Sequence, residues 1–521
     1  MLHTLCPMVI VASKVYVRFK PTRYVESLVS LNGRVVYVGS KEKSLSIARS
    51  LSEALGCREE VVEVDGVVSP GFIDSHVHLA GTAMKKIGIN LEGINSIDEL
   101  LEVVSREATR FREWVYGRGW DQDRLGRWPT RRDLDLVVED KPVLLVRICG
   151  HVAVVNSLAL EKLGYLKKES MNKAMIDYEN GLLFEDAVGD AYYSVKKSMD
   201  PIKLVVEGSR VLARNGITMA SDMGVDEISY IGYLYAYSRG LLSIRTRLYL
   251  SEKLFNELDK VGVVPFGGDE LLRVVGVKSF ADGSLGARTA WLSREYDDDP
   301  TTSGKPLLDS GRVVKLARSV KKYGLDLAIH AIGDAAIREV VRGYIDSNCR
   351  CRIEHASVAP PSVIEEMAKA RVRVSVQPRF IKSDYWVEER LGDRARWVYP
   401  FKSFLRLGLE VGFSSDTPVE DPNPFEGIYF AITRGVLSRL SSSESLDVET
   451  SMYLYTSGSA SILGDHNAGC LEPGCYTDVV VLSHDPLEVY VEEIPSIEVL
   501  ATMVGGKFVY NRDSSSCCIE D

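Results

Sequence analysis

Six residues that can bind or polarise a divalent cation stand at the ends of five separate short apolar runs. They are His76, His78, Lys278, His330, His355 and Asp416. The chain has only 8 histidines, and half of them belong to this pattern. Neutral imidazole is the commonest metal ligand in proteins, and carboxylates bind zinc and other divalent ions. A metal centre that activates water makes a hydrolase, which is the function that these residues indicate.

The spacing of these residues matches the geometry of strands. Residues i and i+2 on a strand point to the same face, so His76 and His78 can bind one ion. Lys278 has no lone pair while protonated, but an amine with a lowered pKa can react with carbon dioxide to form a carbamate that bridges two ions. Each residue alone has an ordinary alternative, such as an exposed lysine, a core histidine, or a helix cap at Asp416 before Thr417-Pro418. Their joint placement favours the metal centre.

The elements that would position these residues are short apolar strands alternating with helical segments. Eight such runs begin near residues 72, 217, 244, 274, 325, 351, 372 and 411. Helical patterns follow many of them, for example at 312–322 and 335–346. Eight β/α units predict a distorted TIM (β/α)8 barrel over residues 70–465, with the six candidates at the carboxyl ends of its strands.

The rest of the chain predicts two attachments to this barrel. Residues 1–69 and 466–512 both contain β-branched runs separated by turns such as Asn32-Gly33, which predicts a small β-sandwich domain formed by both termini. The stretch from about 80 to 215 is too long for a loop, and we interpret it as an inserted subdomain over the barrel mouth. Residues 513–521 form a tail.

Composition excludes several classes of protein. A net charge of -10 over 521 residues argues against a nucleic-acid binder. No apolar run is long enough to cross a membrane, and the N-terminus lacks the basic start of a signal peptide. The nine cysteines are scattered, which predicts a cytoplasmic protein with mostly structural thiols. A ligand pair of Cys351 with His355 is a less favoured alternative.

Several motifs together resemble the amidohydrolase superfamily, specifically its amidohydrolase-3 branch of YtcJ-like proteins and N-substituted formamide deformylases. They are Val68-Ser-Pro-Gly-Phe-Ile-Asp-Ser-His-Val-His, Gly150-His-Val-Ala-Val-Val-Asn-Ser, Val277-Lys-Ser-Phe-Ala-Asp-Gly-Ser-Leu-Gly-Ala-Arg, Ile329-His-Ala-Ile-Gly-Asp, Arg352-Ile-Glu-His-Ala and Gly412-Phe-Ser-Ser-Asp-Thr-Pro-Val. The resemblance implies that His76, His78 and Asp416 bind one metal ion. It also implies that His330 and His355 bind a second, with carboxylated Lys278 as the bridge. The expected metal is zinc, as one or two ions.

Four further residues are candidates for substrate contact. His151 follows an apolar run inside the insertion, and its alternative is a loop histidine bonded to backbone. Trp120 and Asp121 can form another wall of the pocket, although Trp120 fits a core position equally well. Asp282 lies in a glycine-rich loop after Lys278, where it can instead cap a turn. Asp334 fits better as a residue that orients the loop after His330 or caps the next helix.

These observations predict a metal-dependent hydrolase that cleaves a carbon–nitrogen bond of a small amide-like substrate. Asp416 would act as both ligand and proton carrier. The same site could serve an esterase, an isomerase, a decarboxylase or a deaminase, because metal ligands do not fix which bond is cleaved. A non-catalytic regulatory protein is the remaining alternative. We expect a small-molecule substrate, no nucleic acid and no membrane as partners, and by analogy a homodimer.

Overall fold

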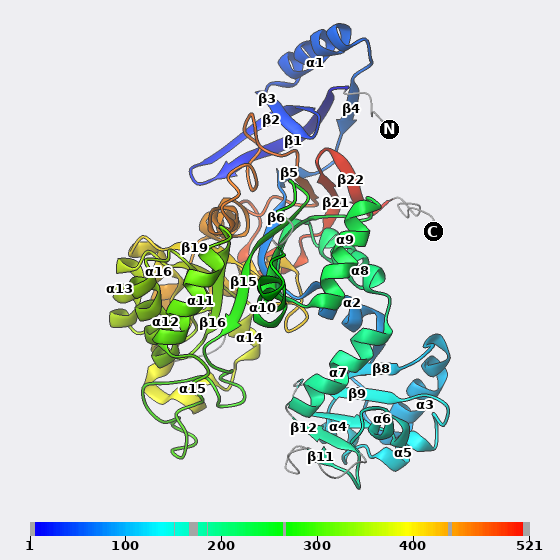
Figure 1. The fold of residues 1–521 in the computed structure, drawn as a ribbon. Coiled ribbons are helices and arrows are strands. Elements are labelled where there is room, and N and C mark those ends of the chain that lie inside the picture. The colour runs from blue at the N-terminus through cyan, green and yellow to red at the C-terminus, as the bar shows by residue number, and fades with distance from the viewer. Residues whose placement is uncertain are drawn as a thin grey trace. The chain divides into compact units, whose positions relative to one another are not determined.

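The computed structural model describes residues 6–148, 150, 152–165, 176–184, 186–263, 267–435 and 440–513 (Figure 1). Apart from Asp513, the predicted tail at 513–521 lies outside these residues. The chain divides into two compact units. The larger, here the barrel unit, comprises Met1–His78, Ser209–Glu227 and Gly240–Asp521, and the smaller, here the inserted unit, comprises Leu79–Gly208 and Ile228–Arg239. The helix α8 (Pro201–Arg214) leads from one unit into the other, inside the bounds of about 80–215 expected for the insertion.

Eight parallel strands form the sheet at the centre of the barrel unit, which confirms the predicted TIM-like barrel. In sheet order they are β6 (Phe72–Val77), β13 (Ile217–Val225), β14 (Arg245–Ser251), β15 (Leu272–Phe280), β16 (Asp326–Ala331), β17 (Arg352–His355), β18 (Arg373–Val376) and β19 (Glu410–Phe413). The first and last strands of this sheet, β6 and β19, are joined by hydrogen bonds at and just after their carboxyl ends. The N–H of Asp416 donates to the carbonyl of His76 at 2.9 Å, and the N–H of His78 donates to the carbonyl of Thr417 at 2.8 Å. These two bonds join the segments that contain three of the candidate ligands.

Helices follow most of these strands. They include α10 (Glu252–Lys260), α11 (Ser310–Lys321), α12 (Asp334–Ser347), α13 (Pro361–Lys369), α16 (Phe401–Arg406), α17 (Pro424–Thr433), α18 (Val448–Tyr453) and α19 (Ser459–Leu463). The helix α11 begins at its cap Asp309 and buries Val313, Leu316 and Val320. Every residue of β17 is buried, as expected for a parallel sheet that is covered on both faces.

Both chain ends contribute to a second sheet in the barrel unit, which confirms the predicted β domain. Its strand order is β22 (Lys507–Asn511), β21 (Val499–Val504), β20 (Val479–Leu482), β5 (Val67–Pro70), β1 (Met8–Phe19), β2 (Thr22–Leu31) and β3 (Arg34–Gly39), and β4 (Glu60–Glu63) pairs with β1. The strands are hydrogen-bonded as one sheet. Val38 of β3 and Met503 of β21 belong to one hydrophobic cluster, so the sheet folds over a common core. Asn32 and Gly33 have φ of 52° and 72°, as the predicted hairpin turn requires.

The inserted unit has its own mixed sheet and core. The sheet order is β11 (Ile176–Asp177), β12 (Leu182–Phe184), β10 (Val152–Val155), β9 (Val143–Arg147), β8 (Val115–Trp120) and β7 (Ile89–Asn90). The helices α2 (Leu79–Ile87), α3 (Ile97–Glu107) and α7 (Asp186–Ser198) flank these strands in the chain. Among the described residues of the whole chain, no helix is long and apolar enough to cross a membrane.

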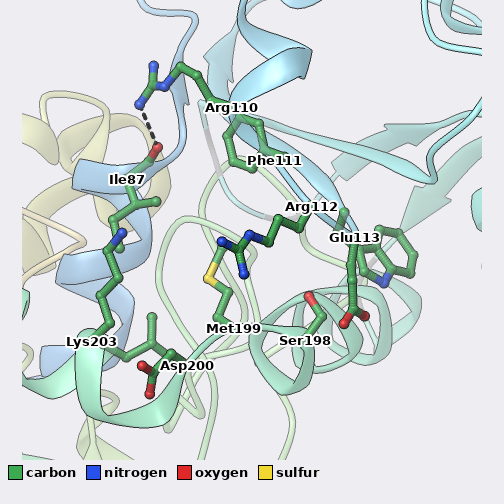
Figure 2. A pocket seen from close by; sticks show the side chains of 11 residues that line it. Ile87, Arg110, Phe111, Arg112, Glu113, Ser198, Met199, Asp200 and Lys203 are labelled. Carbon is green, nitrogen blue, oxygen red and sulfur yellow. Dashed lines mark hydrogen bonds between the residues drawn. The ribbon is translucent and has the colours of Figure 1, made fainter.

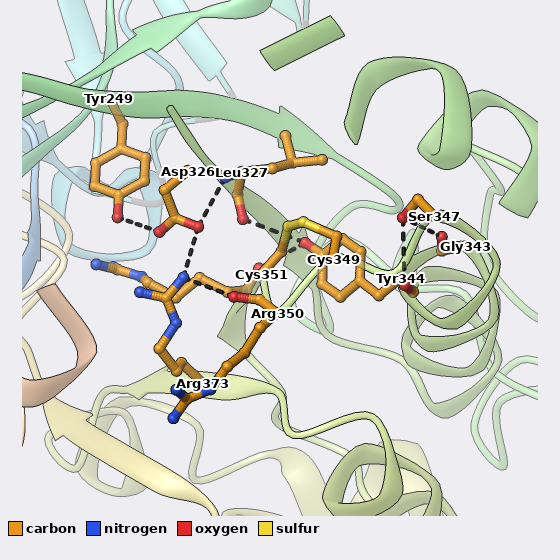
Figure 3. Close-up of a disulfide and its surroundings, with 11 residues drawn as sticks. Tyr249, Asp326, Leu327, Gly343, Tyr344, Ser347, Cys349, Arg350, Cys351 and Arg373 are labelled. Carbon is orange, nitrogen blue, oxygen red and sulfur yellow. Dashed lines mark hydrogen bonds and ion pairs between the residues drawn. A yellow bond between two sulfur atoms is a disulfide. The ribbon is translucent and has the colours of Figure 1, made fainter. Parts of the chain in front are cut away.

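All six cysteines that the structure describes form disulfides, which corrects the expectation that they are scattered structural thiols. The pairs are Cys6–Cys57, Cys349–Cys351 and Cys470–Cys475. Figure 3 shows the second pair just before β17. Because the sulfur of Cys351 is bonded to Cys349, the alternative of a Cys351–His355 ligand pair is excluded.

Candidate metal centre

The six predicted ligands all lie at the carboxyl ends of barrel strands. His76 is in β6 and His78 follows it, Lys278 is near the end of β15, His330 is near the end of β16, His355 ends β17, and Asp416 follows β19. The four imidazole rings form a continuous group. Ring centroids are 5.3 Å apart for His76 and His78, 4.9 Å for His76 and His355, and 4.5 Å for His355 and His330. The structure therefore brings together the residues that the sequence placed far apart.

Asp416 lies between the first two histidines. Its Oδ1 is 3.3 Å from Nε2 of His76 and 3.3 Å from Nε2 of His78. The ligand atoms of these three residues all lie within 4.8 Å of one another. Oδ1 is buried and accepts no hydrogen bond with good geometry from any residue that the structure describes. A buried carboxylate oxygen without a partner is costly, so this oxygen fits a bound cation.

The hydrogen bonds of His76 and His78 explain why they do not satisfy that oxygen. Nδ1 of His76 is 2.6 Å from Oε2 of Glu354, and Nδ1 of His78 is 2.8 Å from the carbonyl oxygen of Met223. Both acceptors favour a proton on Nδ1. In each neutral ring the lone pair is then on Nε2, which is the atom that faces Asp416. The lone pairs of the two Nε2 atoms and of Oδ1 of Asp416 are thus directed at one shared position.

The rings of His330 and His355 are also oriented by one hydrogen bond each. Nε2 of His330 is 2.9 Å from the carbonyl oxygen of Gly283, and Nδ1 of His355 is 2.8 Å from Oε1 of Gln377. The amide nitrogen of Gln377 donates to Oγ of Ser414 at 2.8 Å, which fixes the orientation of this amide. The remaining ring nitrogens, Nδ1 of His330 and Nε2 of His355, are then the ones that can bind a metal ion.

Lys278 is buried beside His76. Its Nζ lies 3.3 Å from Nε2 of His76. Burial lowers the pKa of Lys278 to about 8, against the opposing charges of Glu354 and Asp416. About a tenth of this amine is therefore uncharged at pH 7. Gly276, on the same strand face, leaves room for the ring of Tyr249, which lies where a side chain at this position would be.

The electrostatics of the site give the protonation states that metal ligation requires. Burial and the charge of Lys278 lower the pKa of His76 to about 3. Burial also lowers the pKa of His330 and of His355. Burial alone would raise the pKa of Asp416, but positive charge on His76, His355 and His78 and a hydrogen bond from His78 would lower it whenever these rings are protonated. At neutral pH the buried rings are neutral and the carboxylate is charged, as metal ligands must be.

Unusual backbone conformations place two of the ligands. Glu354 and His355 are adjacent, so a regular strand would point them to opposite faces. His355 has a φ of 72°, which ends the strand and allows both side chains to serve the site. Asp416 has a φ of 57° in the segment that follows β19. Ser415 anchors this segment, because its hydroxyl donates to Asp74 at 2.6 Å.

The sequence interpretation missed Glu354, Arg352, Gln377 and Asp74, which hold the ligands in place. Glu354 receives 2.7 and 2.9 Å hydrogen bonds from Arg352, and both side chains are completely buried. Their i and i+2 spacing in Arg352-Ile-Glu was a signal that both face the barrel interior. Gln377 carried no such signal, because an amide after a strand is common.

Two of the three candidate substrate contacts in the inserted unit, Trp120 and Asp121, have structural partners. Trp120 is completely buried, and its Nε1 donates to the carbonyl of Leu145 at 2.8 Å, which favours the core position. Asp121 caps the short helix α4 (Gln122–Leu125) and lies 3.2 Å from Arg147. His151 lies outside the described residues. Substrate contact by these three residues stays a prediction.

Asp282 and Asp334 organise loops beside His330. The carboxylate of Asp282 accepts backbone N–H groups of Trp291, Ile332 and Gly333, and burial raises its pKa to about 7. Its Oδ1 is also 3.5 Å from Nε2 of His330. Asp334 begins α12 and accepts the N–H of Ser293 at 2.9 Å. The geometry gives Asp282 a role in positioning His330, and its contact with substrate stays a prediction.

Comparisons with known proteins agree with this geometry. Residues 64–510 match the model of the amidohydrolase family. A solved structure of an uncharacterized metal-dependent hydrolase from Pyrococcus horikoshii OT3 is 35% identical, with a TM-score of 0.85, and the match covers 93% of this chain and 99% of that chain. The putative amidohydrolase YtcJ of Bacillus subtilis is 31% identical over 89% of this chain and 93% of the relative. The N-substituted formamide deformylase of Arthrobacter pascens is 25% identical over 93% and 94%, respectively.

The family match covers most of the chain, and its fold is the barrel observed here. A hydrolase that depends on metal accounts for the orphaned oxygen of Asp416 and for the lone pairs that face it. The chain belongs to the amidohydrolase family.

Proposed function

We propose that this protein is a metal-dependent hydrolase that cleaves a carbon–nitrogen bond, other than a peptide bond, in a small amide-like substrate. The observation that carries the proposal is the buried Oδ1 of Asp416, which lies 3.3 Å from Nε2 of both His76 and His78 and accepts no hydrogen bond of good geometry from the described residues. Nitrogen and carboxylate donors of this kind suit zinc, which is the metal that we propose.

Two groups of ligands support one or two ions. His76, His78 and Asp416 would hold the first ion. His330 and His355 would hold the second, and a carbamate on Lys278 would bridge the two. When bound, a divalent cation lowers the pKa of water and stabilises negative charge on a carbonyl oxygen. The uncharged fraction of the Lys278 amine, which its pKa of about 8 provides, is the form that reacts with carbon dioxide.

The chain's own residues supply proton transfer and orientation. Asp416 is charged at neutral pH, so it can accept a proton from the attacking water and return it to the leaving nitrogen. Glu354 and Gln377 hold the rings of His76 and His355 through their Nδ1 atoms, so the ligand nitrogens need not reorient during the reaction. General acid–base catalysis of this kind contributes about a hundred- to ten-thousand-fold to the rate.

The relative from Arthrobacter pascens is named for N-substituted formamides, which motivates N-formyl amines as the first substrates to test. N-acyl amino acids, cyclic ureas, nucleobases and esters complete the panel, because ester hydrolysis, deamination and isomerisation use similar centres. Zinc-loaded protein should release amine and formate from at least one N-formyl amine. Activity on esters alone would assign the site to the alternative reaction.

A metal measurement separates the enzyme from a regulatory protein. Elemental analysis of purified protein should find at least one equivalent of zinc or another transition metal per chain. Dialysis against a chelator should abolish turnover, and added zinc, manganese or cobalt should restore it. Protein that binds none of these metals, and gains no activity from them, would contradict the proposed function.

A further inference from the structure

A pocket in the inserted unit is separate from every candidate metal ligand in the chain. It has a volume of about 480 Å³, which is within the usual range of small-molecule sites. It lies between the turn at 110–114, the corner that joins α7 to α8, and the end of α2 (Figure 2). Its lining is Ile87, Arg110, Phe111, Arg112, Glu113, Trp114, Ser198, Met199, Asp200, Lys203 and Leu204. All these residues belong to one unit, so the pocket is a property of that unit.

One wall of the pocket is apolar and continuous with the core of the inserted unit. Phe111, Trp114 and Leu204 are buried members of its main hydrophobic cluster, and Ile87 and Met199 pack against that cluster. A wall made of core residues is held in place by its packing. Phe111 and Trp114 are only 8% and 2% exposed, so their small accessible areas suit edge contact with an aromatic ring rather than stacking.

The other side of the pocket has positive charge that its neighbours do not neutralise. Arg110 pairs with Glu107 and donates to the carbonyl of Ile87 at 3.3 Å. The side chains of Arg112 and Lys203 have no ion pair or hydrogen bond within the part of the chain that the structure describes. Figure 2 shows the Arg112 side chain extending across the pocket toward Met199. Two cations beside an aromatic wall are the complement of an aromatic anion.

The acidic residues at the pocket restrict the charge of such a ligand. Oδ1 of Asp200 accepts the N–H of Ile202 at 2.9 Å, and Glu113 lies 3.8 Å from Lys162. Neither carboxylate contacts Arg112 or Lys203, so these cations remain available to a ligand. Both carboxylates nevertheless line the same small space and would repel a second negative charge. A monoanion is favoured over a phosphate or a dicarboxylate.

We propose that this pocket binds a small aromatic monocarboxylate, with its ring against Phe111 and Trp114 and its carboxylate against Arg112 and Lys203. The barrel reaction does not require this site. Its ligand is therefore an effector, or a compound that the protein binds in addition to its substrate. The proposal stands whether or not the barrel cleaves amides.

Isothermal titration calorimetry of the full-length protein with 3-phenylpropanoate tests this proposal. We expect binding with one site per chain, and much weaker binding of three matched probes. These are the neutral 3-phenylpropanamide, the aliphatic hexanoate and the dianionic benzylphosphonate at mildly alkaline pH. The amide lacks the negative charge, hexanoate lacks the aromatic ring, and benzylphosphonate carries a second negative charge.

Two variants locate the binding. Arg112→Gln and Lys203→Gln remove the charge but keep a polar side chain at exposed positions, and each should weaken 3-phenylpropanoate binding about tenfold, as expected for loss of one charge-assisted hydrogen bond. Arg132→Gln and Lys197→Gln are the controls, because these exposed residues of the same unit do not line the pocket. They should leave the affinity unchanged.

Three results would overturn the proposal. One is the absence of binding at millimolar 3-phenylpropanoate. Another is equal affinity for the amide, which would show a purely apolar contact. The third is full affinity in the Arg112→Gln/Lys203→Gln double variant, since the carboxylate would then be bound elsewhere, including at the barrel metal centre. Thermal unfolding of each variant confirms that the inserted unit stays folded.

Discussion

The carboxylate of Glu354 lies 2.6 Å from Nδ1 of His76, and both side chains are buried. Arg352 donates to both carboxylate oxygens and also to the carbonyl of Ser75 at 2.6 Å. Burial alone would raise the pKa of Glu354, but Arg352 and His76 hold it well below its usual range. A charged carboxylate behind a ligating imidazole fixes its tautomer and makes the other nitrogen a better donor. Glu354 therefore controls the metal affinity of His76 without contacting the ion.

Replacing Glu354 by Gln should weaken metal binding. Loss of a carboxylate behind a ligating histidine typically costs about 10- to 100-fold in metal affinity or activity. Competition with a chromophoric chelator would measure the zinc affinity, and activity at high zinc concentration should partly recover.

A second buried ion pair provides the control for this experiment. Asp465 receives hydrogen bonds from Arg247 at 2.6 and 3.1 Å, as Glu354 does from Arg352, but it contacts none of the ligands. Glu354→Gln and Asp465→Asn should each lower the free energy of unfolding, by roughly 3–5 kcal/mol, because each leaves a buried arginine unpaired. Only Glu354→Gln should change the zinc affinity. An equal loss in Asp465→Asn would assign the effect to general destabilisation.

Replacing Asp416 by Asn should abolish most of the activity while the protein remains folded. Asn tolerates the positive φ of 57° at this position better than most residues, so the backbone should be retained. We expect kcat to fall about a hundred- to ten-thousand-fold, because the amide cannot accept the proton. The zinc content of the same sample must be measured, so that loss of catalysis is separated from loss of the ion. Unchanged turnover in zinc-loaded Asp416→Asn would exclude the role.

The stability of the protein should depend on pH through Asp384, in the loop after β18. Burial raises the pKa of this carboxyl from its ordinary 3.8 to about 7, despite the hydroxyl of Tyr399 beside it. Between these two values the unfolded chain loses the proton and the folded chain keeps it. The free energy of unfolding should therefore fall as pH rises through this window, by at most about 4 kcal/mol.

Asp384→Asn removes this contribution, because an amide does not ionise. Urea unfolding at about pH 4.5 and about pH 7.5 should show a smaller loss of stability in the variant than in the wild type. Asp393→Asn, at an exposed position nearby in the sequence, serves as the control and should retain the wild-type pH dependence. The idea fails if Asp384→Asn and the wild type lose the same stability over this range.

The disulfides should contribute unequally to stability. Cys6 and Cys57 are 51 residues apart, whereas Cys349 and Cys351 are only 2 apart. Loop-closure entropy predicts a loss of about 4 kcal/mol on removing the first bond and less than about 2 kcal/mol on removing the second. Calorimetric unfolding of the two double Cys→Ala variants would compare them. A larger loss for the Cys349/Cys351 variant would show that loop length does not determine their contribution.

The sequence predicted the barrel well because its strands leave a strong pattern. The eight apolar runs correspond to the eight strands, and the segments at 312–322 and 335–346 correspond to α11 and α12. The helix α1 (Lys41–Leu55) was missed, because its buried face consists of Ser44, Ala48 and Ser52 rather than large apolar residues. Most of the six-stranded sheet of the inserted unit was also missed, because several of its strands are only two to four residues long.

The metal ligands were predictable because each has a distinctive residue type at the end of a strand. The residues that orient them were not, since their roles depend on contacts between distant strands. Gln377 touches His355 from the next strand along the sheet, and Met223 contributes only a backbone carbonyl. Cysteine pairing also depends on distances in space that spacing along the chain does not reveal.

The most direct test of the metal centre is a crystal structure of zinc-loaded protein with anomalous data on both sides of the zinc edge. The account predicts a peak bound by His76, His78 and Asp416. A second peak at His330 and His355, with carbamate density on Lys278, would establish the two-ion form. Anomalous density elsewhere, with Oδ1 of Asp416 bonded to a protein donor and no ion beside it after soaks with zinc, manganese and cobalt, would contradict the account.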